Sequence, residues 1–431
     1  MPTLSPLPQR ASIALGQDWV RSLLAASSGG ATQPAADNGL LGNEWSAARQ
    51  ALESSPFPCR REEAWRFTDL SPLTRIQPHP LAAEEGASRL PPSPSPASWR
   101  LDLEDRSTFS SLSLPEGVEV LQGPDLQGHL GQVLRDTGAD GHWSARLNRA
   151  IVPGVLALRI RGRVTTCLEL ISQAGRRGGV LPLRLLLVLE DGASLTFLQV
   201  HRAGGTSLTS VVVEAQLGRD ASLRHGLVAQ GDAEAALLAV TAVNQSPGSV
   251  YSQTSLCSGW ALARQEPLIL QEDGQASTRL RGLHWLEEHQ IADTHSQVRF
   301  SGPEGTLDQL HKVVAQGESR SVFNGCVQVP RRAQRTQATQ MSRGLLLSER
   351  ARIDTKPELE IVADDVRCTH GATISRLRDE QLFYLRSRGI SAGQASRLLL
   401  RGYCQDVMDD LPVAAQAWNP LSFLLDEVRQ P

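Results

Sequence analysis

The sequence predicts a mainly β protein, a parallel β-helix flanked by a helical region at each end. Three observations lead to this fold class. From about Val155 to about Ile374, short apolar segments alternate with turns rich in Gly, Asp and Ser, which is typical of strands. Within this stretch, a turn-and-strand motif recurs at a fixed spacing. The chain before and after it shows the periodicity of amphipathic helices.

Residues 1–150 form the first predicted region, which is mainly helical. Helices are expected at 18–25, 43–52, 126–136 and 143–150. Asn43 is a suitable N-cap for the second of these helices. The stretch 86–98 is rich in Pro and Ser, and therefore predicts a linker inside this region.

Residues 151–375 form the predicted β-helix core. The motifs Ala193-Ser194-Leu195, Ala221-Ser222-Leu223 and Ala276-Ser277-Thr278 each follow a turn, and the second of the two steps between them is close to twice the first. Gly305-Thr306 then follows Ser277 by one more single step. A fixed period in an all-strand region favours a solenoid over a sandwich, because each coil buries its apolar surface on its neighbour. The alternative is chance similarity among small turn residues.

Residues 376–431 are predicted to be helical again. Apolar periodicity covers 379–386 and 391–408, and a short segment at 421–428 ends the chain. Ser391 is well placed to cap the longer helix. The apolar face of that helix could pack on the β-helix, dock a partner, or do both.

Composition excludes several functional classes. The net charge of −3 does not match a nucleic-acid binder, and no apolar run is long enough to span a membrane. No secretory signal is visible, so the cytoplasm is the expected location. The six cysteines contain no CxxC pair and do not indicate a disulfide framework. Lysine occurs only at Lys312 and Lys356, neither in a phosphate-loop pattern, so any ATP must be hydrolysed by a partner.

Several sequence blocks together resemble the SufB/SufD family of the SUF iron–sulfur cluster assembly machinery. The most specific are residues 356–373 (KPELEIVADDVRCTHGAT) and 382–390 (LFYLRSRGI). Further matching blocks are 61–70 (REEAWRFTDL), 147–150 (LNRA), 345–348 (LLLS) and 351–354 (ARID). The block CTHGAT, the block FYLRSR and the modest chain length resemble the SufD branch more than the SufB branch. The resemblance spans most of the chain, and is weak only in about the first 50 residues and in the Pro/Ser-rich stretch.

The resemblance implies a right-handed parallel β-helix between helical regions, and a non-catalytic scaffold rather than an enzyme. It implies pairing with a SufB-like protein through the β-helices, and docking of a SufC-like ATPase on the C-terminal helices. It also implies a part in iron acquisition and in forming the nascent cluster at the interface between the two β-helices. Iron or an Fe–S cluster would be held transiently and shared with the SufB-like partner. No tightly bound cofactor is expected in the isolated chain, which could instead self-pair as a homodimer.

Cys368 and His370 are the candidate metal ligands. Residues two apart on a strand project from the same face, and thiolate and imidazole both suit iron or an Fe–S cluster. Two ligands do not complete a site, so the others would come from the SufB-like partner or from sulfide. By resemblance, His370 stands where the family has a functionally important histidine. The alternative is a small buried cysteine beside a capping or dimer-contact histidine.

The other histidines, cysteines and arginines considered are expected to have structural roles. His284, His289 and His295 are expected to be solvated or satisfied residues at strand edges, and Cys257 and Cys326 to lie in the core. The arginines at 331, 332, 335 and 343 are expected to form a solvated edge that discourages aggregation.

Two alternative functions remain at this point. A β-helix enzyme acting on polysaccharide would need aromatic platforms and paired carboxylates, whereas the chain has only 3 Tyr and shows no such carboxylate pair. The other alternative is a SufB-like scaffold paralogue.

Overall fold

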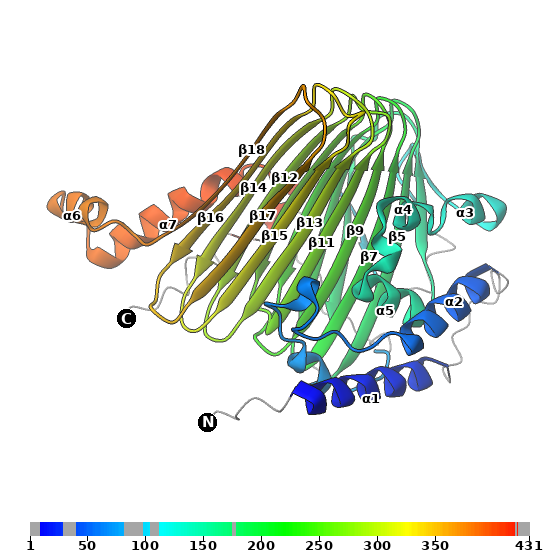
Figure 1. Cartoon of the computed structure of the whole chain (residues 1–431), viewed down its shortest axis with the longest axis horizontal. Coiled ribbons are helices and arrows are strands. Elements are labelled where there is room, and N and C mark those ends of the chain that lie inside the picture. Colours follow the sequence, from blue (N-terminus) through cyan, green and yellow to red (C-terminus); the bar gives the residue numbers. More distant parts are fainter. Residues whose placement is uncertain are drawn as a thin grey trace.

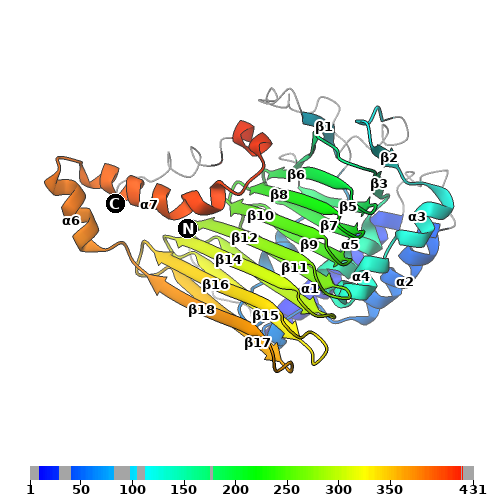
Figure 2. The same ribbon diagram turned by 90° about the horizontal axis from the view of Figure 1, so that it is seen from above.

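The computed structural model describes residues 9–28, 40–81, 98–103, 112–174, 178–418 and 420. Its centre is a solenoid of parallel strands, with helices packed against two opposite sides (Figures 1 and 2). The mainly β fold class, a parallel solenoid with terminal helices, is therefore confirmed. The predicted linker, apart from Ser98, and the predicted helix at 421–428 lie outside the described residues.

Successive strands alternate between two sheets, each with nine described strands. In spatial order, sheet A consists of β17 (Arg352–Ile361), β15 (Arg320–Val329), β13 (Ile291–Phe300), β11 (Leu262–Gln271), β9 (Ala236–Gln245), β7 (Ser207–Leu217), β5 (Gly179–Leu189), β3 (Leu156–Ile160) and β2 (Val118–Val120). Sheet B consists of β1 (Ser98–Asp102), β4 (Cys167–Ala174), β6 (Ser194–Ala203), β8 (Ser222–Gln230), β10 (Val250–Ser258), β12 (Ser277–Leu286), β14 (Thr306–Ala315), β16 (Gln337–Leu346) and β18 (Arg367–Ser375). Neighbours are parallel except β2 and β3, which are antiparallel.

The strand register explains the sequence repeat. Ser194 pairs with Ser222, Ser222 with Val250, Val250 with Ser277, and Ser277 with Thr306. Each repeat is therefore one coil of two strands, and the longer step from Ser222 to Ser277 spans two coils. The intermediate coil begins at Val250 and lacks the Ala-Ser signature, which is why the motif does not mark it.

The central core lies between the two sheets. Alternate residues along each strand face inward, as Leu183, Leu185 and Leu187 do on β5. The residue between two of these, Leu186, faces outward and packs under the helices instead. Because both faces of the strands are covered, β5 has the continuous apolar sequence of a buried parallel strand.

Two histidines lie in the core on the earlier strands of sheet B. The His201 ring shares a hydrogen bond of 2.7 Å with the Ser172 hydroxyl. His225 bonds to the Gln199 side chain at 2.8 Å and to the Tyr251 hydroxyl at 3.0 Å. Burial lowers the pKa of His201 to about 4 and that of His225 to about 3, so both are neutral at pH 7.

His284 and His311 lie further along the same interior. His284 bonds to Ser321 at 3.1 Å and to Thr294 at 3.0 Å, and its ring meets His311 edge-on at 4.4 Å between centroids. His311 also stacks on Phe323. The prediction that His284 lies at a strand edge is wrong. The reason is that apolar and polar residues do not separate cleanly onto two faces of this strand, so the pattern does not reveal which face is interior.

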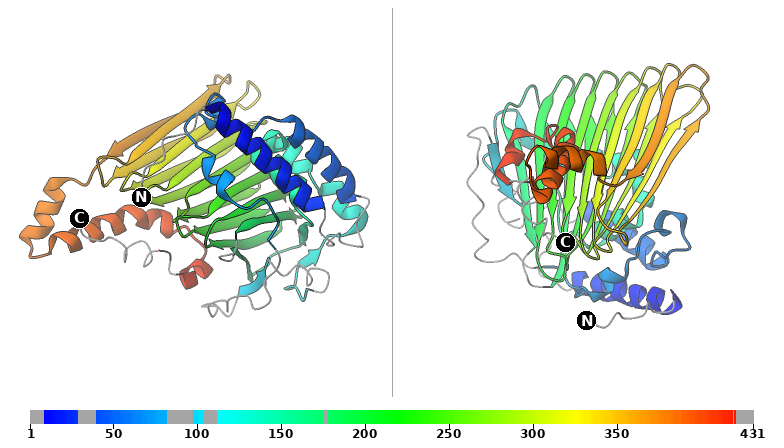
Figure 3. Two further views of the ribbon diagram at one scale, coloured as in Figure 1. Left: turned by 90° about the horizontal axis from the view of Figure 1, so that it is seen from below. Right: turned by 90° about the vertical axis from the view of Figure 1, so that its left-hand side faces the viewer.

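Helical segments from the N-terminal region cover the outer face of sheet A (Figures 1 and 3). They are α1 (Gln9–Ser28), α2 (Leu40–Ser54), α3 (Gly123–His129), α4 (Gln132–Thr137) and α5 (Trp143–Ile151), with the 3₁₀ turns η1 (Glu63–Trp65), η2 (Ser71–Arg75) and η4 (Ala139–Gly141). Leu23, Leu52 and Leu147 of these helices pack in one cluster with Leu238 and Leu262 of the sheet. Burial of this kind stabilises by about 25 cal/mol per Å² of apolar surface.

A buried ion-pair cluster fastens the segment 61–70 to sheet A. The Arg264 side chain is 1% exposed and bonds to Asp293 at 2.6 Å and to Glu266 at 3.0 Å. Its guanidinium stacks on Trp65 at 3.9 Å and donates to the Ala64 carbonyl. Burial alone would raise the pKa of Asp293, but the charges of Arg264 and His295, with hydrogen bonds from His295 and Thr68, together lower that pKa to about 2. The sequence block around Trp65 therefore has a structural use.

C-terminal segments cover part of sheet B. They are α6 (Asp379–Ser387), α7 (Ala392–Met408) and η5 (Val413–Trp418). Ser391 caps α7, as the sequence predicted, and Gln394 completes a reciprocal capping box with it. The later part of α7 and η5 pack on the sheet through Cys404, Val407 and Trp418, whereas α6 projects beyond the strands (Figures 1 and 2).

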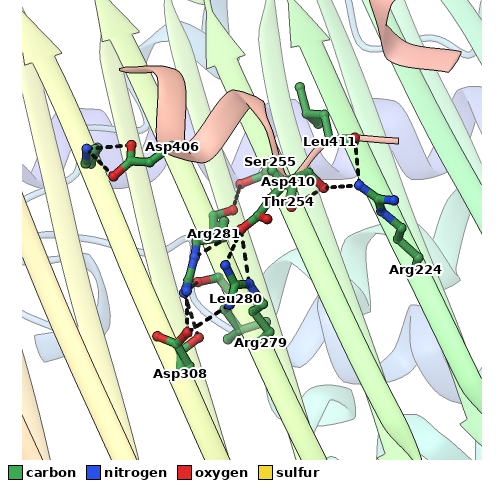
Figure 4. Close-up of polar contacts among 11 residues, drawn as sticks. Arg224, Thr254, Ser255, Arg279, Leu280, Arg281, Asp308, Asp406, Asp410 and Leu411 are labelled. Carbon is green, nitrogen blue, oxygen red and sulfur yellow. Dashed lines mark hydrogen bonds and ion pairs between the residues drawn. The ribbon is translucent and has the colours of Figure 1, made fainter. Parts of the chain in front are cut away.

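Charged contacts hold the end of α7 and the residues that follow it on sheet B (Figure 4). The Lys312 ammonium bonds to both Asp406 carboxylate oxygens, at 2.6 and 2.7 Å. The Asp410 carboxylate forms ion pairs with Arg279 at 2.7 Å and with Arg281 at 3.3 Å. We call this set of contacts the root clamp, because it fixes the base of the projecting helices.

The buried histidines predict loss of stability on mild acidification. A histidine whose pKa is lowered by folding binds its proton more tightly in the unfolded state, so it destabilises the fold as pH falls from 6.5 towards about 4. Each such group costs about 1.4 kcal/mol per pH unit within that window. His201→Asn should therefore reduce the pH slope of the unfolding free energy by about one proton.

Urea unfolding at several pH values between about 4.5 and 7 measures this slope. His289→Gln is the matched control, because that side chain is 80% exposed and should leave the slope unchanged. An unaltered slope in His201→Asn would show that the interior histidines do not govern acid stability.

The Arg264 cluster yields a second prediction. Arg264→Met leaves Asp293 and Glu266 buried without their main counter-charge, which should destabilise the chain by about 3–5 kcal/mol. Arg279→Met removes a half-exposed ion pair and should cost less than about 1 kcal/mol. Thermal melting of the two variants compares them directly, and equal losses would contradict the anchoring role of Arg264.

Candidate functional site

The candidate site lies on the last coil of the solenoid. Within the described chain, β18 pairs only with β16, and β17 pairs only with β15. The backbone groups along their outer edges therefore have no strand neighbour. Figure 2 shows this pair of strands at the end of the solenoid opposite β1, β2 and β3.

Cys368 and His370 occupy alternate positions on β18 and share one face. In register, Cys368 pairs with Ala338 and His370 with Gln340, and both of these β16 residues are buried between the sheets. Cys368 and His370 therefore stand on the interior face, at the coil where the interior ends. Cys368 is half-buried and packs against the central core, whereas His370 is exposed.

The two side chains differ in their surroundings. Burial raises the pKa of the Cys368 thiol, so the free residue is protonated at pH 7 and needs a metal or a positive neighbour to become a thiolate ligand. Beside His370, the Gln340 amide donates to Gln309 at 2.9 Å. The oxygen of this amide, Oε1, is buried and accepts no hydrogen bond from the described residues, so it is an available acceptor next to the imidazole.

Sequence analysis missed Gln340 as a neighbour of the site. A signal was present, because Gln309, Gln340 and His370 fall at one position in three successive coils. Extending the repeat beyond Thr306 would have found it.

The described residues supply only part of a metal site. Among them, no group of three or more His, Cys, Asp or Glu side chains could hold a metal ion. Cys368 and His370 provide at most two donors, and about four are needed for a closed site. This edge of the molecule could therefore bind a metal only with ligands from outside the described chain.

Cys326 lies on the opposite side of sheet A from the core. It pairs in register with Glu358, and its exposure is intermediate. Burial, followed by the charges of Glu360 and Glu358, raises its pKa to about 11. The prediction that Cys326 lies in the core is wrong, because one step along a strand reverses the face. Cys257 does lie in the core, as predicted.

The remaining candidates have ordinary roles. His289 is solvated in a turn, and His295 contacts Asp293 at 3.1 Å. The arginines at 331, 332, 335 and 343 are all exposed, as predicted. All six cysteines are free. No helix within the described ranges has the length and apolarity that crossing a bilayer requires.

Comparison with known proteins gives consistent results. Residues 171–403, just over half of the chain, match the family model for the SUF system FeS cluster assembly SufBD core domain. An iron–sulfur cluster assembly SufBD family protein of Synechocystis is 30% identical over 404 residues, covering 88% of this chain and 89% of that protein.

Two further relatives cover similar lengths. The chloroplastic protein ABCI7 of Arabidopsis thaliana is 29% identical, with 88% of this chain and 85% of that protein covered. The iron–sulfur cluster assembly protein SufD of Escherichia coli is 28% identical, with 84% and 87% covered. The match over the strands, helices and candidate site shows that the chain belongs to the SufB/SufD family of iron–sulfur cluster assembly proteins and is SufD-like within it.

Proposed function

We propose that this chain is a non-catalytic scaffold subunit that pairs with a SufB-like protein and docks a SufC-like ATPase. One observation carries the proposal: Cys368 and His370 stand at the coil where the solenoid remains open. A second solenoid end placed there would supply the ligands that this chain lacks. Iron and sulfide are the substrates of such a site, and the nascent cluster is its product.

The two ends of the solenoid differ in a way that favours one partner. At the first end, the short antiparallel strand β2 closes sheet A, and the five-residue β1 ends sheet B. At the other end, full-length β17 and β18 expose Ile361 and Ile374, and Val362, just after β17, is 65% exposed. Long edge strands with exposed apolar side chains favour pairing with another chain. Pairing through this end alone gives a closed pair rather than a filament.

The incomplete ligand set suits a scaffold. A site divided between two subunits binds its metal only while both contribute, so the product can be released when the interface changes. Thiolate and imidazole are both found as ligands of iron–sulfur centres. Because burial raises the pKa of the Cys368 thiol, this residue would become a thiolate ligand only when a bound metal displaces its proton.

ATP hydrolysis would belong to the partner. Neither Lys312 nor Lys356 lies in a phosphate-binding loop, and the Lys312 ammonium forms an ion pair with Asp406. The helices α6 and α7, which project from the body, are the proposed docking element. Family membership argues against the polysaccharide enzyme, and the SufD-like identity argues against the SufB-like paralogue.

The role of His370 can be tested by copurification. The wild-type chain and His370→Ala would be coexpressed with the SufB-like and SufC-like proteins of the same genome, and iron and sulfide measured anaerobically. We expect the complex to form with both chains, and the His370→Ala complex to contain markedly less iron and sulfide because one ligand is missing.

His289→Ala controls for the loss of an exposed histidine elsewhere, and should assemble cluster normally. Normal cluster content in His370→Ala would leave that residue with a structural role only. A wild-type chain that binds neither partner would refute the scaffold proposal.

The open edge gives a further prediction for the chain alone. We expect the isolated protein to form a homodimer through β17 and β18, because the same edge meets an equivalent copy of itself. The Arg367 amide donates inward to Thr336, so the alternate amides of β18, including that of Ala372, point to the open edge. Ala372→Pro removes one of these donors and should shift the dimer towards monomer in sedimentation analysis.

Arg331→Pro serves as the control for this variant. Arg331 follows Pro330 in the turn that the Ala333 amide closes on the Pro330 carbonyl, a position where proline is tolerated. It should leave the dimer intact. A dimer that Ala372→Pro does not weaken would place the interface elsewhere.

A further inference from the structure

An internal cavity lies between the two sheets, in the middle coils of the solenoid. It offers about 30 Å³ of space to the centres of water molecules, and its walls come from β8 to β14. In register, Ala239 stands between Val211 and Gln265 on sheet A, and Gly282 stands beside His311 on sheet B. These two small residues leave the space open, since a Cβ at Gly282 would come within 2.6 Å of the His311 Nδ1 atom.

Four polar side chains face the cavity without a hydrogen-bond partner in the protein. The Gln265 amide nitrogen and the His311 Nε2 atom are both buried, and neither finds a partner among the described residues. Within the same part of the chain, no hydrogen bond joins the side chains of Thr241 and Gln253 to another protein group. All four residues belong to the interior of the solenoid and are only 3–6% exposed.

Other interior groups show how such side chains are usually satisfied. His225 bonds to the Gln199 side chain and to the Tyr251 hydroxyl, and the Gln271 amide donates to the Thr278 hydroxyl at 2.8 Å. A buried amide or imidazole that loses its bonds to water and gains none in the protein destabilises the fold. Four such groups around one cavity therefore indicate a polar occupant that bonds to them.

The charge of the surroundings selects a neutral occupant. Glu266 and Arg281 also border the cavity, but their side chains form ion pairs on the outer faces of the sheets, with Arg264 and Asp308. Burial lowers the pKa of His311 well below its usual value, so this ring is uncharged at pH 7. A metal ion or a phosphate in the cavity would therefore lack a counter-charge.

We propose that this cavity is a permanent water site, which holds two water molecules bonded to Thr241, Gln253, Gln265 and His311. A buried water needs about 10–15 Å³ of such space and about two to four polar partners. The available space of about 30 Å³ fits two molecules. The four side chains give each water two partners, and the bond between the two waters gives each a third.

The water site lies at the inner end of a hydrogen-bonded line that leads towards the open coil. Gln309 lines the cavity, donates to the Ser296 hydroxyl at 2.8 Å and accepts from the Gln340 amide at 2.9 Å. Gln340 pairs in register with His370. The two waters therefore support, from inside, the polar residues behind the candidate site. This inference does not depend on the proposed function, because it holds whether or not His370 binds a metal.

A high-resolution crystal structure of the wild-type chain tests the inference directly. We expect two density peaks in the cavity, each about 2.7–3.2 Å from polar atoms of the four side chains. The same crystals under xenon pressure should show no xenon in the cavity, because dry apolar cavities bind this gas whereas hydrated polar ones do not.

Magnetic relaxation dispersion of the water oxygen nucleus gives a second readout in solution, since it counts the water molecules held inside a protein. Thr241→Val combined with Gln265→Leu nearly keeps the side-chain volumes but removes two of the four polar partners. This variant should lose the signal of about two waters. Thr339→Val combined with Gln337→Leu makes the same chemical changes at exposed positions of β16 and should keep the signal. Thermal melting of both variants checks that they fold.

Each outcome decides the inference. Water density without xenon, and a loss of signal confined to the cavity variant, support the site. A cavity that binds xenon and shows no water density is dry, and the inference then fails. It also fails if Gln253 and Gln265 bond directly to each other and close the cavity, or if the density belongs to a larger molecule. If the cavity variant does not fold, the wild-type structure alone decides among these outcomes.

Discussion

Every strand in a parallel solenoid needs a hydrogen-bonding neighbour on both edges, and the last coil has one on a single edge. This constraint organises the molecule. At the first coil, β2 turns antiparallel and is only three residues long, so little edge remains. At the last coil, β17 and β18 keep the length of the strands before them. The open edge and the candidate ligands therefore occur together, because both are properties of the same coil.

Apolar side chains on the outward face of each sheet must also be covered, and the N- and C-terminal segments pack over them. Each is fixed by charge as well as by apolar packing. The only two lysines of the chain take part on opposite sides. Lys312 holds Asp406 of α7 on sheet B, and Lys356 contacts Glu63 of the N-terminal segment at 2.5 Å beside sheet A. Loss of Arg264 from its buried cluster should cost more than loss of the exposed Lys356 contact, because it would leave Asp293 and Glu266 as buried charges without their partner.

The sequence predicted the fold class because a solenoid repeats its own geometry. Small turn residues return at each coil, and the register of Ser194, Ser222 and Ser277 follows the motif. Which face of each strand points into the interior was harder to predict. A parallel strand covered on both sides has no apolar alternation, so Cys326 and His284 could not be assigned to the outside or the interior from pattern alone. The family motif pointed to Cys368 and His370, but their position at an open coil required the structure.

The arrangement places the open coil on one continuous segment with the helical arm, residues 376–402, which contains α6 and the first part of α7. Only residues 371–378 separate His370 from the first residue of α6. The other end of the arm returns to the body through α7, where Asp406 and Asp410 are bound to β14 and β12. The arm is thus covalently joined to the candidate site strand at one end and held by ion pairs at the other. Helix α6, which has no buried side chain, has the least support from the body, whereas Leu377 in the short connection to β18 packs against the same apolar cluster as α7. Any movement of α6 would therefore reach β18, which carries His370, through the connection that contains Leu377.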